Sequence, residues 1–316
     1  MFYLDRPPRV IDTRVFSSMP AKWRRTGVSS PWAEANKAGQ PVDSFLEGPA
    51  FDAQGRLHVV DIPFGRIFRI DRSDRSHGGD GSEEWTLIAE YDGQPNGLRF
   101  HPDGRMLIAD YRRGILQLDP RGGQPEPLLD SRNGESFKGC NDLALAANGD
   151  LYFTDQGQTG LQDPTGRVYR LSADGRLDCL LSNGVSPNGL ALDPSGRVLY
   201  VAMTRDNAVW RVPLLASGGT AKVGRFCTLF GTSGPDGLAV DDEGRLYVAH
   251  ASLGHVFVFA PNGECVARVK SCAGETVTNL AFGGPQRNQL FITESKSGSV
   301  LVAEVGATGL ALPPAV

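Results

Sequence analysis

The sequence predicts an all-β protein, a six-bladed β-propeller with four antiparallel strands in each blade. One phrase occurs six times in the 316 residues, and its copies begin at Glu47, Asn96, Asn141, Asn188, Asp236 and, in degraded form, Thr278. Successive copies begin 42 to 49 residues apart, a period typical of stacked β units. The copies follow one another without a linker, so we expect a single propeller domain over residues 47–316.

The third copy illustrates the strands of one unit. Short apolar runs cover 143–145, 151–155, 168–171 and 177–181, and an Asn148-Gly149 turn separates the first two. A tandem of β-sandwiches is the alternative, but a sandwich domain needs about twice this repeat length. No long window has apolar residues at helical spacing, so we expect little helix.

The two ends of the chain predict how the ring closes. The last copy offers only three runs, at 280–282, 290–293 and 299–305, and is one strand short. Residues 9–16 alternate like a strand, and we expect them to pair with the last unit and remove the open edges. We assign residues 1–46 to an N-terminal extension. Within it, residues 19–40 are either a lid over the channel or an oligomer contact, with packing against the blades as the alternative.

Composition narrows the class of protein. The formal net charge is −4 and no long run of Lys or Arg occurs, which argues against nucleic acid as a partner. The N-terminus lacks a signal-peptide pattern and no segment approaches 18 apolar residues, so we expect a cytoplasmic protein without a membrane partner. Five scattered cysteines, an odd number, are interpreted as reduced thiols. We expect a monomer or a small homo-oligomer.

The first residue of each copy is the candidate functional position. In each copy this residue begins the innermost strand of the blade, and the hairpin lies at the other end of that strand. Six such residues should therefore converge at one mouth of the central channel. The alternative is that Asn-Gly and Asp-Gly are simple turns, but the first five copies already have their hairpin glycine eight residues later. Carboxylate and amide oxygens favour Ca²⁺, Mg²⁺ or Mn²⁺, so the ring predicts a divalent metal on the axis.

Four of these motifs, in this order and spacing, resemble the SMP-30/gluconolactonase/LRE-like family of metal-dependent lactonases, which is related to diisopropyl fluorophosphatase and paraoxonase. The motifs are Phe45-Leu46-Glu47-Gly48-Pro49, Cys140-Asn141-Asp142-Leu143, Pro187-Asn188-Gly189-Leu190 and Pro235-Asp236-Gly237-Leu238. The resemblance implies that Glu47, Asn188 and Asp236 bind one divalent ion, and that Asn141 completes the coordination sphere or contacts the substrate. We expect Ca²⁺ in the first place, with Mg²⁺, Mn²⁺, Zn²⁺ or Fe²⁺ as alternatives.

The reaction that the resemblance implies is hydrolysis of a lactone, such as a sugar aldonolactone, to the hydroxy acid. Asp236 is our candidate for the general base. Further candidates for contact with the substrate are Asn96 in the ring and four residues at the ends of second strands: Tyr111, Arg112, Asp155 and His250. For each of these four, an ordinary polar surface role is the alternative.

Two departures from the family pattern bear on the substrate. Gly139 occupies the place where animal-type members carry an arginine that meets the sugar, and Ala239 occupies the place of an acid in the second calcium site of the fluorophosphatase-like members. A phosphotriesterase-like hydrolase stays open as an alternative, as does a non-enzymatic calcium-binding propeller scaffold.

Overall fold

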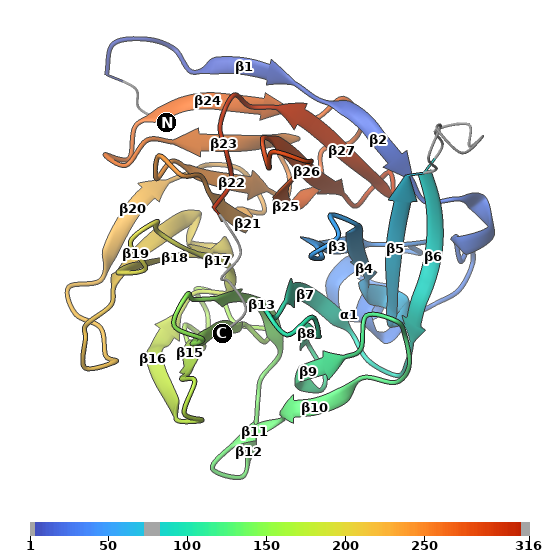
Figure 1. Ribbon diagram of the computed structural model, residues 1–316, viewed down its shortest axis with the longest axis horizontal. Helices are drawn as coiled ribbons and strands as arrows, with labels where there is room; N and C mark the ends of the chain where they lie inside the picture. Colours follow the sequence, from blue (N-terminus) through green and yellow to red (C-terminus); the bar gives the residue numbers. More distant parts are fainter. Residues whose placement is uncertain (1–3, 73–82, 311–316) are drawn as a thin grey trace.

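Six small antiparallel sheets are arranged in a ring in the computed structural model, which describes residues 4–72 and 83–310 (Figure 1). The first three blades, written from their first strand outward, are β3 (Leu46–Phe51), β4 (Leu57–Asp61), β5 (Arg66–Arg72), β6 (Glu83–Glu90); β7 (Pro95–Phe100), β8 (Met106–Asp110), β9 (Gly114–Leu118), β10 (Glu126–Leu129); and β13 (Cys140–Leu145), β14 (Leu151–Asp155), β15 (Gly166–Leu171), β16 (Leu177–Gly184). The six first strands contact one another in a closed circle, so they form the innermost layer. The predicted six-bladed propeller is confirmed.

The remaining blades complete this ring. They contain β17 (Pro187–Leu192), β18 (Val198–Met203), β19 (Ala208–Pro213), β20 (Gly224–Thr228); β21 (Pro235–Val240), β22 (Leu246–His250), β23 (His255–Phe259), β24 (Cys265–Lys270); and β25 (Val277–Gly283), β26 (Gln289–Glu294), β27 (Ser299–Glu304). A short hairpin, β11 (Ser131–Arg132) with β12 (Glu135–Ser136), leads into the third blade. As the sequence predicts, the last blade has three strands of its own.

The N-terminus supplies the missing strand. β2 (Arg14–Ser18) pairs antiparallel with β27 and completes the last blade, as the alternation over residues 9–16 predicts. The expected single strand is nevertheless divided at Thr13, because β1 (Arg9–Asp12) pairs in parallel with β24 of the fifth blade (Figure 1). The Thr13 side chain donates to the Lys270 carbonyl at 2.9 Å where the chain crosses between blades. The terminus therefore ties together two blades instead of one.

Helix is scarce, as expected. α1 (Pro31–Lys37) is the one α-helix of the described residues, and Ser30 caps it by accepting a hydrogen bond from the Ala33 amide at 3.2 Å. The 3₁₀ turns of residues 4–72 and 83–310 are η1 (Ala21–Trp23), η2 (Ile62–Phe64) and η4 (Thr204–Asp206). α1 packs against η2, which follows the second strand of the first blade. This contact places α1 at the channel mouth where the opening residues of the repeats lie.

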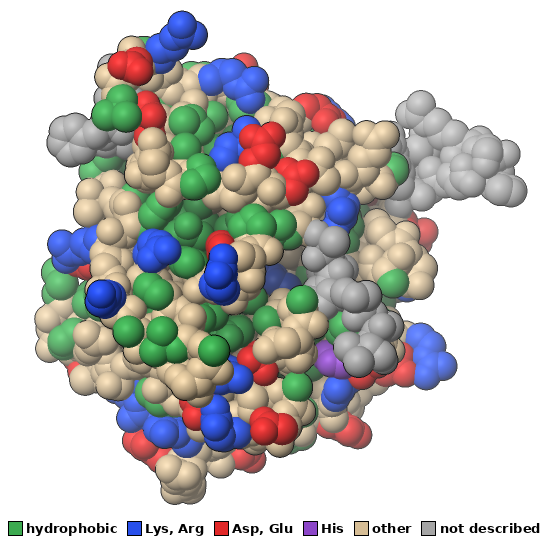
Figure 2. All heavy atoms as spheres, turned by 60° about the vertical axis from the view of Figure 1, so that its left-hand side comes forward, with side chains coloured by type: hydrophobic (Ala, Val, Ile, Leu, Met, Phe, Trp, Pro, Cys, Tyr) green, Lys and Arg blue, Asp and Glu red, His purple; other side chains and the backbone are tan. Residues whose placement is uncertain are grey.

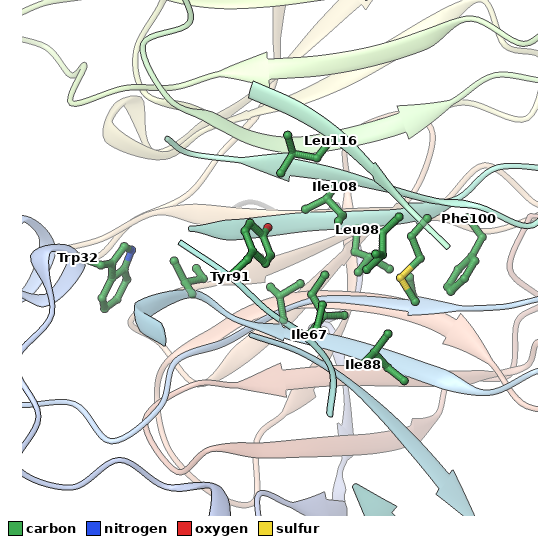
Figure 3. Close-up of a cluster of buried hydrophobic side chains, with 14 of the residues drawn as sticks. Trp32, Ile67, Ile88, Tyr91, Leu98, Phe100, Ile108 and Leu116 are labelled. Atoms are coloured by element: carbon green, nitrogen blue, oxygen red, sulfur yellow. The ribbon is translucent and has the colours of Figure 1, made fainter. Parts of the chain in front are cut away.

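The hydrophobic core is divided into layers between neighbouring blades. The layer between the first and second blades contains Ile67 from β5 and Leu98, Ile108 and Leu116 from β7, β8 and β9 (Figure 3). Figure 3 also shows Trp32 of α1 at the edge of this cluster. The N-terminal extension is thus anchored in the core, which gives α1 a defined position above the first blade.

The remaining features of the structure are the charges of its surface, the length of its helices and the state of its cysteines. Acidic and basic side chains are interspersed over the face displayed in Figure 2. No helix of the described residues is long and apolar enough to cross a membrane. All five cysteines are free, and Cys140, Cys227 and Cys265 are buried, in accordance with the expected reduced thiols.

Candidate functional site

The six opening residues converge at one end of the inner strands. Each inner strand has a β-bulge at or directly beside this position, for example between Cys140 and Leu143 in β13 and between Pro235 and Leu238 in β21. A bulge releases residues from the ladder and redirects their side chains. All six residues are buried: Glu47, Asn96, Asn141, Asn188, Asp236 and Thr278. The local backbone therefore gathers the predicted oxygen donors into one buried ring.

A second tier of polar groups lies directly beneath this ring. The position after the opening residue is glycine in four copies, but it is Asp142 in the third and Asn279 in the sixth. A Cβ on Gly97 would approach the Asp142 Oδ1 to 2.5 Å, and a Cβ on Gly237 would approach the Asn279 Oδ1 to 2.2 Å. Glycine at these two positions is what makes room for the buried side chains of the neighbouring blades.

Asn279 connects the two tiers. Its Nδ2 donates a hydrogen bond to Glu47 Oε2 at 2.8 Å, and the Gly48 amide donates to the same oxygen at 2.6 Å. Burial raises the pKa of the Glu47 carboxyl well above its ordinary value, and the neighbouring Asp236 raises it further. The two hydrogen bonds act in the opposite direction. Glu47 is therefore held in place by hydrogen bonds from Asn279 and Gly48, while burial and a neighbouring carboxylate disfavour its charged form.

Asp236 occupies a comparable environment. Burial raises the pKa of its carboxyl to about 7, and the charge of Asp142 contributes in the same direction. A hydrogen bond with Asn188 and the positive charges of Lys37 and Arg205 oppose this shift. The ring thus contains two buried carboxylates, one of which has a pKa near neutrality.

Asn141 is oriented by a chain of hydrogen bonds. Its Nδ2 donates to Gln156 Oε1 at 2.8 Å, and Gln156 Nε2 donates to Ser186 Oγ at 3.0 Å. Because the amide nitrogen is directed to Gln156, the Asn141 Oδ1 is left as an acceptor for a cation or a donor group. Gln156 also links the third blade to the residues that precede Asn188 in the fourth.

The remaining two members of the ring differ from each other. The Thr278 hydroxyl donates to the Leu46 carbonyl at 3.1 Å and lies 2.8 Å from the Ser295 Oγ, so it fastens the last blade to the first. Asn96 is buried, and its backbone carbonyl lies against Gly48 of the neighbouring inner strand. Thr278 is thus used by the fold, and the role of Asn96 stays a prediction.

The four residues predicted at the ends of second strands lie in different surroundings. Tyr111 is partly buried and its hydroxyl accepts from Gln158 Nε2 at 2.8 Å, while Arg112 is exposed and forms an ion pair with Asp92. Asp155 Oδ1 accepts from the Gly139 amide at 2.8 Å, two residues before Asn141. The Asp155 carboxylate therefore fixes the entry into β13.

His250 is completely buried, and its ring also lies close to the segment that follows β20, where a Cβ on Gly231 would come within 3.1 Å of its Cε1. Its ring packs against Phe257 with centroids 6.0 Å apart, and Nδ1 accepts from the Ser252 amide at 3.4 Å. Burial lowers the pKa of His250 to about 4, so the imidazole is neutral at physiological pH. It pairs in β22 with Pro235, the residue before Asp236.

The N-terminal extension contributes a residue to the mouth. Lys37, at the end of α1, has its Nζ 4.6 Å from the centre of the Phe45 ring and lines a cavity of about 600 Å³. The same cavity is lined by Ser295, whose Oγ donates to the Leu46 carbonyl at 2.6 Å directly before Glu47. Burial lowers the pKa of Lys37, and the charge of Asp236 opposes this shift.

The chemistry of the ring fits a hard divalent cation. Two buried carboxylates and the amide oxygens of Asn141 and Asn188 are ligand types that Ca²⁺ and Mg²⁺ prefer. A cation would also relieve the repulsion that raises the pKa of Glu47 beside Asp236. Within the described residues, no three acidic, His or Cys side chains are grouped so that they could hold a metal. A metal here would depend on the two amides.

Sequence reasoning missed three groups at this site, namely Asp142, Asn279 and Lys37, whereas Arg205 lies just beyond a second strand, β18, where the sequence predicts residues that line the pocket. The first two carry a signal in the repeat, because they replace a glycine that the other four copies retain. Lys37 lies outside the repeated phrase, in α1, and no local pattern indicates that it approaches Asp236.

Comparisons with known proteins agree with this architecture. The model of the family described as SMP-30/Gluconolactonase/LRE-like region matches residues 45–296. A gluconolactonase of Zymomonas mobilis is 34% identical over 220 residues, which cover 63% of this chain and 60% of that protein. The lactonase drp35 of Staphylococcus epidermidis is 28% identical over 296 residues, which cover 88% of this chain and 87% of that protein.

A solved structure shares the fold over the whole length. The structure of regucalcin from Agrobacterium tumefaciens, described as a calcium-binding protein, aligns with a TM-score of 0.74 and 21% identity, and covers 98% of this chain and 100% of that one. The family model spans all six inner strands and both tiers of the ring. From the match and the propeller together, we conclude that this chain belongs to the SMP-30/gluconolactonase/LRE-like family.

Proposed function

We propose that this protein is a metal-dependent lactonase that opens a sugar lactone to the hydroxy acid. The observation that carries the proposal is the buried ring of Glu47, Asn141, Asn188 and Asp236, in which two carboxylates lie at one end of the channel. Relatives named gluconolactonase and lactonase support a lactone-hydrolysing function. A calcium-binding member of the same fold supports a divalent ion.

Glu47, Asn188 and Asp236 would hold the ion, with Asn141 completing the sphere or binding the substrate. A divalent ion bound there would polarise the lactone carbonyl and stabilise the negative charge that develops on its oxygen. Asn279 keeps the Glu47 carboxylate in position through the hydrogen bond of 2.8 Å. Gln156 holds the Asn141 amide so that its oxygen faces the ring.

Asp236 is proposed as the general base. Without a metal, burial raises its pKa to about 7, and a bound divalent cation would lower this pKa again, so the carboxylate would be ionised at neutral pH and able to accept a proton. In this role the carboxylate accepts a proton from the attacking water and returns it to the alkoxide that leaves when the ring opens. The burial of the site restricts the access of other water molecules.

The test begins with metal analysis of the purified protein. Hydrolysis of five- and six-membered sugar lactones is then followed by acid release before and after treatment with a chelator, and a phosphotriester in the same panel examines the alternative reaction. We expect lactone hydrolysis that is lost on chelation and restored by Ca²⁺ or another divalent ion. Protein without bound metal whose lactonase activity survives chelation would contradict the proposal.

Three substitutions assign the roles. We expect Asp236→Asn to retain the fold and lose most turnover, and Glu47→Ala and Asn188→Ala to lose metal affinity. Asp242→Asn is a matched control, because Asp242 is an exposed residue at the far hairpin of the same blade. Full activity in Asp236→Asn would remove the base assignment, and unchanged metal affinity in Glu47→Ala would remove the ring as the metal site.

A further inference from the structure

The acidic residues that end the second strands make one recurring contact. In four blades the last residue of this strand is a buried carboxylate, namely Asp61, Asp110, Asp155 and Glu294. Each accepts a hydrogen bond, at 2.7 to 3.0 Å, from the backbone amide two positions before the ring residue of its own blade. The donors are the amides of Phe45, Gln94, Gly139 and Thr276. The carboxylate thus holds the backbone that leads into the ring.

In the first blade, three contacts fix Phe45. Its amide donates to Asp61 Oδ1 at 2.7 Å, and its carbonyl accepts from the Ile62 amide at 3.2 Å. Its ring packs against Trp32 of α1, with the ring centres 4.5 Å apart. Because Glu47 follows two residues later, a fixed Phe45 limits the positions that the Glu47 carboxylate can take.

Asp61 is itself held by a buried arginine. Its Oδ2 accepts from Arg66 Nε at 2.9 Å, and the exposed fraction of Arg66 is only 1%. The same guanidinium group donates from Nη1 to the Trp23 carbonyl at 2.7 Å, and it lies 5.2 Å from the centres of the Phe64 and Phe68 rings. Arg66 therefore connects the N-terminal extension to Asp61.

The second and last blades satisfy the other carboxylate oxygen without a charged partner. Asp110 Oδ1 accepts from the amides of Arg112 and Arg113, and Glu294 Oε2 accepts from the Ser297 amide. The first blade instead uses a buried ion pair. Because such a pair adds little net stability, its effect lies in the geometry that it imposes.

The position of the Glu47 carboxylate depends on the backbone of β3. Its Oε2 accepts from the Gly48 amide at 2.6 Å and from Asn279 Nδ2 at 2.8 Å, so it has little freedom of its own. A shift where the chain enters β3 would move this carboxylate relative to Asn188 and Asp236, which belong to other blades. Loss of a group that orients a metal ligand lowers metal affinity about ten- to hundredfold.

We propose that Asp61 is a positioning residue of the metal site. By holding the Phe45 amide, it sets the position of the Glu47 carboxylate, and Arg66 keeps the Asp61 side chain in place. The proposal rests on the metal-binding role proposed for Glu47. It adds to the site two residues that lie outside the ring, and through Arg66 it gives the N-terminal extension a part in supporting the metal.

Two double variants separate the ion pair from the hydrogen bond to Phe45. Asp61→Leu with Arg66→Met removes both, whereas Asp61→Asn with Arg66→Met removes the ion pair and keeps an Oδ1 acceptor for the Phe45 amide. Replacing both members of the pair leaves no unpaired charge in the core. Asp61→Ala with Arg66→Met takes the place of the leucine variant if leucine is not accommodated.

The measurement is calorimetric titration of the metal-free proteins with Ca²⁺, with urea unfolding in the absence of metal as the record of stability. We expect Kd to rise about tenfold or more in the leucine variant, and to stay within about threefold of the wild type in the asparagine variant. A purely structural ion pair would affect both variants alike, so equal Kd values in the two folded proteins would overturn the proposal.

Asp110→Leu is the matched control. Asp110 makes the same contact with the Gln94 amide, two residues before Asn96, which is not among the proposed metal ligands. We expect this variant to lose stability and to keep Kd for Ca²⁺ within about threefold of the wild type. A Kd that rises as much in Asp110→Leu as in the leucine double variant would overturn the proposal, because the carboxylates would then act only through the stability of the ring.

The outcomes separate this proposal from the proposed function. Wild-type protein that binds neither Ca²⁺ nor another divalent ion would overturn the metal site and, with it, the role of Asp61. Calcium binding by the wild type with an unchanged Kd in the leucine variant would overturn the role of Asp61 alone and leave the metal-dependent lactonase standing.

Discussion

Replacing Asn279 with leucine tests whether the second tier of the channel supports the metal site. The substitution keeps a side chain of similar volume and removes the Nδ2 that donates to Glu47 Oε2 at 2.8 Å. A hydrogen bond to a charged group contributes about 1.5 to 3 kcal/mol, and each 1.4 kcal/mol corresponds to a factor of about ten in affinity. We therefore expect the dissociation constant for Ca²⁺ to rise about ten- to hundredfold, which is the usual effect of losing a group that orients a metal ligand.

The assay is titration of metal-free protein with Ca²⁺ by calorimetry, together with the increase in Tm on calcium binding. Circular dichroism and a cooperative thermal transition establish that the variant is folded, and Asn279→Ser serves as a second variant if leucine is not accommodated. Asn262→Leu is the control, because Asn262 lies in an exposed turn of the fifth blade, where it accepts a hydrogen bond from the Glu264 amide. A dissociation constant within twofold of the wild type in folded Asn279 variants would refute the reasoning.

The remaining predictions concern stability. Gly237→Ala places a Cβ 2.2 Å from Asn279 Oδ1, so we expect a loss of more than about 2 kcal/mol in urea unfolding, and wild-type stability would show that the inner strands are not closely packed there. Burial lowers the pKa of His58 and of His250 to about 4, so the unfolded chain binds protons first as the pH falls. Their stabilising contribution is complete above about pH 6.5 and is lost toward pH 4, by about 3 kcal/mol each. Urea unfolding at pH 7.5 and 5 should show a smaller acid loss in His58→Gln than in the wild type, and equal losses would contradict this. Deletion of residues 1–17 removes the strands that tie together the last two blades, so we expect it to abolish soluble folding, and a cooperative, soluble truncated protein would refute the closure.

Most of the fold could be predicted because every blade repeats the same short pattern of apolar runs and turn residues. The alternating apolar runs and the hairpin glycines, such as Gly149 with φ of 85°, act over a few residues and are visible in the sequence. The division of the N-terminal strand at Thr13 was not predicted. It depends on the distance between β24 and β27 in space, and no pattern within residues 9–16 carries this information.

The site could be predicted in part, for the same reason. The ring residues occupy one position of the repeat, so the strand period alone brings Glu47, Asn141, Asn188 and Asp236 together. The hydrogen bond that holds Glu47 comes from Asn279, which is 232 residues away in the chain. Such a contact exists only after the ring has closed.

The sequence by itself determined the six blades, the strand that completes the last one, and the oxygen donors at the end of the inner strands. These features follow from short-range periodicity, which the chain repeats six times. Only the tertiary structure decided the electrostatic environment of Asp236, because the charges of Lys37 and Arg205 act on it from α1 and η4, two segments without a shared pattern. Electrostatic interactions act through space rather than along the chain, so the environment of Asp236 depends on how the ring closes.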